Sequence, residues 1–138
     1  MEATTIRLRE WTPEDDADLR AIHAAQGLGY EFPQLETPLF VVKLVAVDEN
    51  GKVRGAVFAR LTAEIFCIID PTMEKKQAAF REGMAATERL LFLKGLDDVH
   101  AFVPPKMNGM GKVLESYGFQ RDWQCFCKQL GENNGARS

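Results

Sequence analysis

AEIFCIIDPTMEKKQAAFREGMAATERLLFLKG, residues 63–95, joins a short apolar run to a long segment of helical periodicity. The run at residues 65–69 predicts a buried strand, and the residues after Asp70-Pro71-Thr72 predict an amphipathic helix. A strand that turns directly into a helix presents backbone N–H groups at the helix start, where an anion can bind. The same pattern is also typical of a strand-turn-helix packing unit that binds no ligand.

Chain length and composition predict one folded domain. With 138 residues, 46% hydrophobic and 27% charged, the chain can bury a single core, and we expect a domain over residues 1–130 and a flexible tail over residues 131–138. A net charge of −3 supplies no basic surface for a phosphate backbone, so we expect no nucleic-acid partner. No apolar run is long enough to cross a membrane, and the amino terminus shows no signal pattern. These features predict a cytoplasmic protein with no membrane partner.

The three cysteines are expected to remain thiols. Cys67, Cys125 and Cys127 are odd in number and lie in strand-like apolar surroundings, which argues against a disulfide framework. Cys125 and Cys127 would share one face of a strand, where His23 or His100 could complete a metal site. Because zinc ligands normally occur in pairs at turn-compatible spacing, which this sequence lacks, we predict no metal.

Periodicity and turn signals divide the rest of the chain into elements. Ile6 and Leu8 fall on one face of a half-buried strand, and Thr12 and Pro13 are typical of a helix start. Asp48-Glu49-Asn50-Gly51 predicts a hairpin turn, because Asn and Gly both tolerate positive φ. The predicted order is strand 4–9, a helix ending near Gly27, strands 39–47 and 52–61, a third meander strand 64–70, the long helix, strand 99–103, a helix ending at Gly118 and strand 119–130.

Aromatic residues mark one predicted loop. Residues 28–38 mix aromatic, Gly and Pro types without a sustained period, as in a loop that lies across a pocket. The alternative is that Tyr30 and Phe32 anchor this loop to the core. His23, on the flank of the preceding helix, is either a ligand or base, or an ordinary packing residue.

Four fragments follow one another in an order that matches a known superfamily. TIRLREWTPEDDADLRAIH is similar to its opening strand and helix, VAVDENGKVRGAVFARL to its central hairpin, AEIFCIID to a strand of its histone-modifying branch, and VLESYGF to its Gly-Phe ending. Together they resemble the Gcn5-related N-acetyltransferase superfamily over roughly residues 4–130. The resemblance implies an α/β (α+β) fold with a central mixed, mostly antiparallel sheet of about six strands and three to four helices.

The resemblance also implies acetyl-CoA as a co-substrate. Its pantetheine arm would lie where the strand 64–70 splays from the strand near Val99, and would bond to the backbone of Cys67, Ile68 and Ile69. Its pyrophosphate would lie at the start of the long helix.

Charged residues complete this implied site. Lys75 and Lys76, in or near the first helical turn, would offset the phosphate charge. Glu64 matches the base glutamate of the histone-modifying branch through Ala-Glu-Ile. Acetyl transfer needs such a base to deprotonate an amine, together with donors for the oxyanion.

Two motifs of the superfamily are missing. Its glycine-containing phosphate loop has only Phe80-Arg81-Glu82-Gly83-Met84-Ala85 as a counterpart, inside the predicted helix. Leu114 stands where many members carry a tyrosine acid, four residues before the Gly of the Gly-Phe ending.

The matches and the departures leave three expectations. The leading one is an N-acyltransferase that moves acetyl to a primary amine of a small molecule or peptide by direct attack. The second is a catalytically inactive binding or interaction protein of the same fold. The third is a homodimer whose strands pair across subunits, with Trp123 and Phe126 at the contact.

Overall fold

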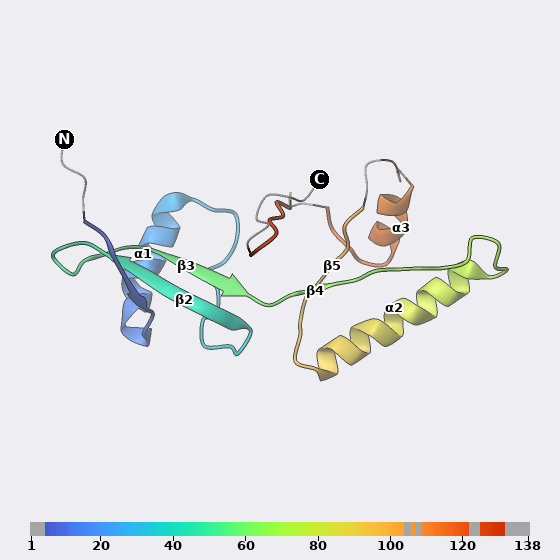
Figure 1. Cartoon of the computed structure of the whole chain (residues 1–138), viewed down its shortest axis with the longest axis horizontal. Coiled ribbons are helices and arrows are strands. Elements are labelled where there is room, and N and C mark those ends of the chain that lie inside the picture. Colours follow the sequence, from blue (N-terminus) through green and yellow to red (C-terminus); the bar gives the residue numbers. More distant parts are fainter. Residues whose placement is uncertain (1–4, 104–105, 107–108, 122–124, 132–138) are drawn as a thin grey trace. The chain divides into compact units, whose positions relative to one another are not determined.

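The structure is a computed structural model that describes residues 5–103, 106, 109–121 and 125–131 (Figure 1). It is an α+β structure with three α-helices and two sheets, and it divides into two compact units, residues 1–100 and 101–138. The elements are β1 (Arg7–Glu10), a 3-10 turn (Pro13–Asp15), α1 (Asp16–Gln26), β2 (Phe40–Val47), β3 (Val53–Arg60), β4 (Ala63–Glu64), α2 (Lys76–Leu93), β5 (Val99–His100) and α3 (Met110–Ser116).

The first sheet is antiparallel, in the order β1-β2-β3 (Figure 1). The predicted hairpin between β2 and β3 is confirmed. The Asp48 carboxylate accepts hydrogen bonds from the backbone N–H groups of Asn50 (2.9 Å) and Lys52 (3.0 Å). In this turn Gly51 has a positive φ (79°), whereas Asn50 does not. The Asp48 side chain satisfies the turn's N–H groups, and Asn50 keeps an ordinary backbone conformation.

The core lies on one face of this sheet, where α1 packs against β3. Its buried side chains are Leu19, Val45, Val47 and Val53, with Trp11, Ile22, Phe32, Ala56 and Phe58 packed against them. Phe32 therefore anchors the loop at residues 28–38 to the core, which is the alternative to a loop that lies across a pocket. The opposite face is open, and Leu8 and Val57 are 61% and 68% exposed there.

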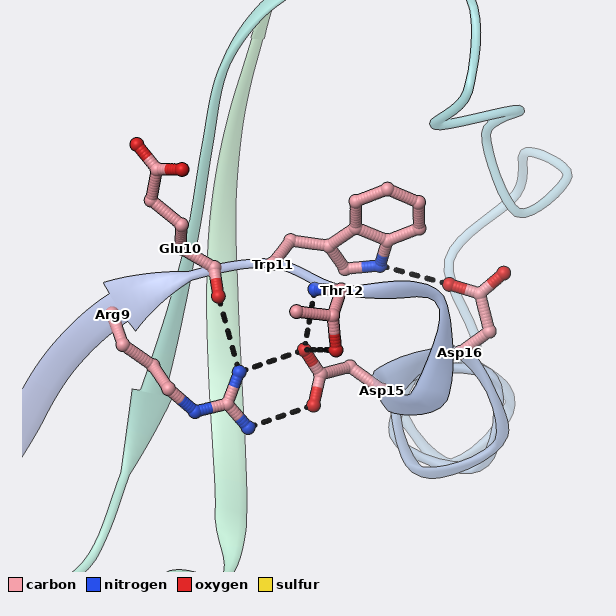
Figure 2. A network of polar contacts seen from close by, with 6 residues as sticks. All are labelled: Arg9, Glu10, Trp11, Thr12, Asp15 and Asp16. Atoms are coloured by element: carbon pink, nitrogen blue, oxygen red, sulfur yellow. Dashed lines mark hydrogen bonds and ion pairs between the residues drawn. The ribbon is translucent and has the colours of Figure 1, made fainter.

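A polar network joins β1 to the start of α1 (Figure 2). The Arg9 guanidinium donates two hydrogen bonds to the buried Asp15 carboxylate, from Nη1 to Oδ2 at 2.8 Å and from Nη2 to Oδ1 at 2.7 Å. The Thr12 N–H donates to the same carboxylate at 2.9 Å, and Trp11 Nε1 donates to Asp16 at 2.9 Å. The helix start predicted at Thr12 and Pro13 is therefore present, as a 3-10 turn that leads into α1.

The second sheet is a short parallel pair of β4 with β5. Ala63 pairs with Val99 and Glu64 with His100, and the Ile65 N–H donates to the His100 carbonyl at 2.9 Å. The predicted third meander strand, residues 64–70, is wrong in both length and partner, because the strand covers only Ala63–Glu64 and pairs with β5 instead of β3.

The prediction of an α+β fold is therefore confirmed, but the prediction of a single central sheet is not. Three α-helices are present among the described residues, but the single sheet of about six strands is replaced there by one three-stranded and one two-stranded sheet. An apolar run does not itself specify which strand it pairs with. Here the Ala63 N–H donates to the Asp98 carbonyl and the Ile65 N–H to the His100 carbonyl, so β4 takes its backbone partners from β5. Arg60, at the end of β3, forms ion pairs with Asp97 and Asp98 just before β5.

Glycines end both carboxyl-terminal helices, as predicted. Gly95 follows α2 with φ 87°, and the Leu96 N–H donates back to the Leu91 carbonyl at 3.0 Å. Gly118 follows α3 with φ 91°, and the Phe119 N–H donates to the Leu114 carbonyl at 3.1 Å. Both arrangements are glycine-terminated helix caps.

The predicted last strand, residues 119–130, is absent wherever the structure describes that stretch. Trp123 and residues 132–138 of the predicted tail lie outside the described residues. Within the described part of the chain, no helix is both long enough and apolar enough to span a membrane.

Candidate functional site

The residues assigned to cofactor binding follow directly after the β4–β5 ladder. Cys67 is exposed, Ile68 is 96% exposed and Ile69 is half-buried. Among the described residues, the backbone groups of residues 66–69 form no hydrogen bonds. This stretch is an extended segment whose N–H and C=O groups are available to a ligand.

A compact turn connects this segment to α2. Asp70 Oδ1 accepts hydrogen bonds from the Thr72 N–H at 2.9 Å and from the Thr72 hydroxyl at 2.8 Å. These two bonds lower the pKa of the Asp70 carboxyl below its ordinary value. The Met73 N–H donates to the Asp70 carbonyl at 3.1 Å and closes the turn.

The two lysines assigned to phosphate binding flank the first residue of α2. Lys75 precedes the helix in the left-handed conformation (φ 57°), and no side chain caps the helix start. Lys76 Nζ lies 3.5 Å from the Pro71 carbonyl oxygen, so this side chain folds back over the turn. Two cationic side chains and the uncapped N–H groups of an 18-residue helix therefore share one location.

Glu64, the sequence-based candidate for the general base, is exposed on β4. Its ladder partner is His100. His100 Nε2 lies 3.4 Å from Asp98 Oδ2, and the same Asp98 oxygen lies 3.9 Å from Arg60 Nη1. Sequence reasoning considered His100 only as a metal ligand and missed Asp98. Asp98 lies just before β5, outside the strand predicted at residues 99–103, so no strand pattern in the sequence linked it to His100.

A shallow cavity of about 240 Å³ lies between the end of α2 and the start of β5. Leu91, Phe92, Leu96 and Val99 supply apolar walls, and Glu88, Asp97 and Asp98 supply carboxylates. None of the residues predicted for cofactor binding lines it, and neither does Glu64.

The cysteines form no disulfide. Cys125 Sγ and Cys127 Sγ are 3.7 Å apart, so the two side chains share one side of their segment as expected. His23 instead packs edge-on against Tyr30 (5.1 Å between ring centroids) and Phe32 (5.8 Å). Within the described residues, no group of three or more His, Cys, Asp and Glu side chains is placed to hold a metal ion.

No protein-family model, curated protein or solved structure matches this chain. The chemistry of the site is therefore argued from its own residues. It combines an open backbone segment, a helix start with two lysines, and an adjacent group of carboxylates with one imidazole. Such a combination can bind an extended amide-containing ligand with a charged phosphate end.

Proposed function

We propose that this protein is an acyl-CoA-dependent N-acyltransferase of Gcn5-related fold that transfers acetyl from acetyl-CoA to a primary amine by direct attack. The observation that carries the proposal is the end of the parallel β4–β5 ladder. Within the part of the chain that the structure describes, pairing stops after Ile65, and residues 66–69 form no backbone hydrogen bond before a tight turn leads into a helix start without a side-chain cap.

Pantetheine fits the open segment because it carries two amides along an extended chain. Those amides can hydrogen-bond the backbone of Cys67, Ile68 and Ile69 in the way a further strand would. The exposed apolar side chain of Ile68 can cover the methylene groups of the arm. The segment therefore supplies both kinds of contact that a pantetheine arm requires.

The start of α2 supports pyrophosphate binding at the other end of the cofactor. Helix N–H groups and the positive end of the helix dipole favour an anion. Lys75 and Lys76 add two positive charges in place of the missing glycine loop. Because Lys76 Nζ is near a backbone carbonyl and no carboxylate, its charge stays available to phosphate.

Glu64 supports chemistry at the ladder end. An exposed carboxylate three residues before Cys67 can hold or deprotonate an acceptor amine beside the thioester. Three cysteines without a disulfide suit a reducing compartment, and we accordingly place the reaction in the cytoplasm.

The alternative is a catalytically inactive binding protein of the same fold. It is favoured by the absence of the glycine loop and by Leu114, which is buried and apolar where many superfamily members carry an acid. Such a protein would either bind coenzyme A without turnover or not bind it at all.

Thermal melting with acetyl-CoA tests the proposal. A ligand at about one hundred times its dissociation constant stabilises the folded state by about 2.7 kcal/mol, which raises the melting midpoint by several degrees. The K75E/K76E variant is expected to lose most of this shift. The K52E/K94E variant, with the same charge change away from the α2 start, should keep it.

Three outcomes of these experiments decide between the enzyme and the inactive binding protein and test the role of the two lysines. No shift of the wild type at millimolar acetyl-CoA contradicts cofactor binding and hence the enzyme. A full shift in K75E/K76E rejects the phosphate role of the lysines. Binding without thiol release across a panel of primary amines supports the inactive alternative.

A further inference from the structure

Charged side chains from three strands meet at the end of the β4–β5 ladder. Glu64 lies on β4, Asp98 and His100 lie at and just before β5, and Arg60 ends β3. His100 Nε2 is 3.4 Å from Asp98 Oδ2, which is also 3.9 Å from Arg60 Nη1. Asp97 pairs with Arg60 and has no ion pair with His100.

The ladder register places the key groups on one face. Residues directly paired across a sheet project to the same side, as do residues two apart in a strand. Glu64 is paired with His100, and Asp98 precedes His100 by two residues. The register therefore puts Glu64 and His100 on the same face of the ladder, and the 3.4 Å distance from Nε2 to Oδ2 places Asp98 beside His100.

The cluster also lies next to the segment proposed to hold pantetheine. The Glu64–His100 pair is the last of the ladder, and the Ile65 N–H bonds to the His100 carbonyl immediately after it. Cys67 follows only two residues later. A thioester at the near end of that segment would come closest to Glu64 and His100.

We propose that His100 is the general base of the acyl transfer, that Asp98 positions its imidazole, and that Glu64 binds the acceptor, which is a cationic primary amine. This inference rests on the proposed acyltransferase function. Asp98 Oδ2 lies 3.4 Å from Nε2, so Nδ1 is the ring nitrogen assigned to accept the proton. Asp98 orients the ring, as the third group does beside a catalytic histidine.

The step balances without a further reactant. The ammonium R–NH₃⁺ first gives one proton to His100 Nδ1. The free amine nitrogen attacks the thioester carbonyl carbon, so a C–N bond forms and the carbonyl electron pair moves to oxygen. As that pair returns, the C–S bond breaks, and the thiolate takes the second proton from the amine nitrogen. The products are the acetamide and coenzyme A thiol, and His100 releases its proton to water.

The ordinary pKa values of imidazole and carboxylate explain why we assign His100 as the base and Glu64 as the group that binds the amine. Imidazole ordinarily titrates near pH 6.5, whereas glutamate carboxylates ordinarily titrate near pH 4.3. A base whose pKa is close to the working pH is the more effective proton acceptor. A carboxylate that stays charged is better suited to hold an ammonium group.

The pH dependence of kcat/KM with a primary amine tests the proposal. The wild type should show a rising limb that reports one ionisation, and H100Q should lose that limb with about a 10²- to 10⁴-fold fall in kcat. D98N should lower kcat and leave KM for the amine unchanged, because the imidazole loses its positioning partner. E64Q should raise KM for the amine and keep the limb. D18N, the same change at an exposed position of α1, should leave both unchanged.

Two further measurements keep the result unambiguous. Acetyl-CoA thermal shifts equal to wild type in H100Q and D98N show that these variants are folded and bind cofactor. Exogenous imidazole should restore activity to H100G. A wild-type pH profile in H100Q, with turnover intact, overturns the role of His100 and leaves the acyltransferase standing. A wild type that neither binds acetyl-CoA nor acetylates any amine overturns the function and this inference together.

Discussion

At the scale of single residues, Asp15 shows how one carboxylate fixes an element start. It is almost fully buried, and burial of an unpaired charge would be strongly unfavourable. Arg9 and the Thr12 N–H satisfy its oxygens (Figure 2). The hydrogen bonds from Arg9 are the main cause of a pKa of Asp15 below the ordinary aspartate value.

We predict that D15N destabilises the protein by about 2 kcal/mol at pH 7, because hydrogen bonds to a charged partner are lost and Arg9 loses its counter-ion. Urea denaturation of the wild type and the variant measures the difference. The matched change D16N keeps an amide oxygen that can accept from Trp11 Nε1 and should cost less. Equal losses in both variants would contradict a special role for Asp15.

The Arg9–Asp15 pair also predicts how the stability difference between the wild type and D15N depends on pH. Because the folded pKa of Asp15 is depressed, its contribution is complete above the unfolded aspartate pKa of about 3.9 and is lost as pH falls toward the folded pKa. The stability gap between wild type and D15N should therefore shrink below about pH 4. A constant gap from pH 7 to pH 3 would contradict the ion pair.

Residue types predicted part of this network. Thr12 and Pro13 indicated the helix start, whereas the partner of Asp15 could not be foreseen. Arg9 alternates with the apolar Leu8, so the pattern suggested that Arg9 faces solvent. In the structure Leu8 is exposed and Arg9 turns toward Asp15, because a specific pair across the strand-helix junction outweighs the alternation.

At the scale of elements, local turn chemistry was the most predictable feature. The β2–β3 hairpin and the glycine ends of α2 and α3 follow from signals a few residues long. The extent of β4 did not, since an apolar run specifies neither which strand it pairs with nor where pairing stops. The partner of β4 is β5, whose first residue lies 35 positions after the end of β4 in the sequence.

At the scale of elements, substitutions of two glycines are expected to change the stability of the protein in opposite directions. G51A should destabilise the hairpin by about 1 kcal/mol, because Gly51 has φ 79°. G83A should stabilise α2 by about 0.5–1 kcal/mol, because Gly83 lies within the helix and an added Cβ meets no described atom within 4 Å. Denaturant midpoints measure both. A destabilising G83A would show that α2 packs closely against another segment at this point.

At the scale of the whole molecule, the order of the predicted elements and the resemblance predicted the α+β class but not the division into two sheets. The candidate site was predicted as a position in the chain, the stretch from Glu64 to Lys76. Among the described residues, only its part at residues 66–69 is without backbone hydrogen bonds over several consecutive positions, and the start of α2 has no side-chain cap. His100 and Asp98 could not be added from sequence, because only the β4–β5 register brings them beside Glu64.

The central claim is that the backbone of Cys67, Ile68 and Ile69 binds acetyl-CoA. Amide resonances recorded by NMR during an acetyl-CoA titration test it most directly. The proposed account predicts saturable shifts at these three residues and at the start of α2, with the β2–β3 turn unchanged. Saturating acetyl-CoA that leaves the amides of residues 67–69 unmoved would contradict it.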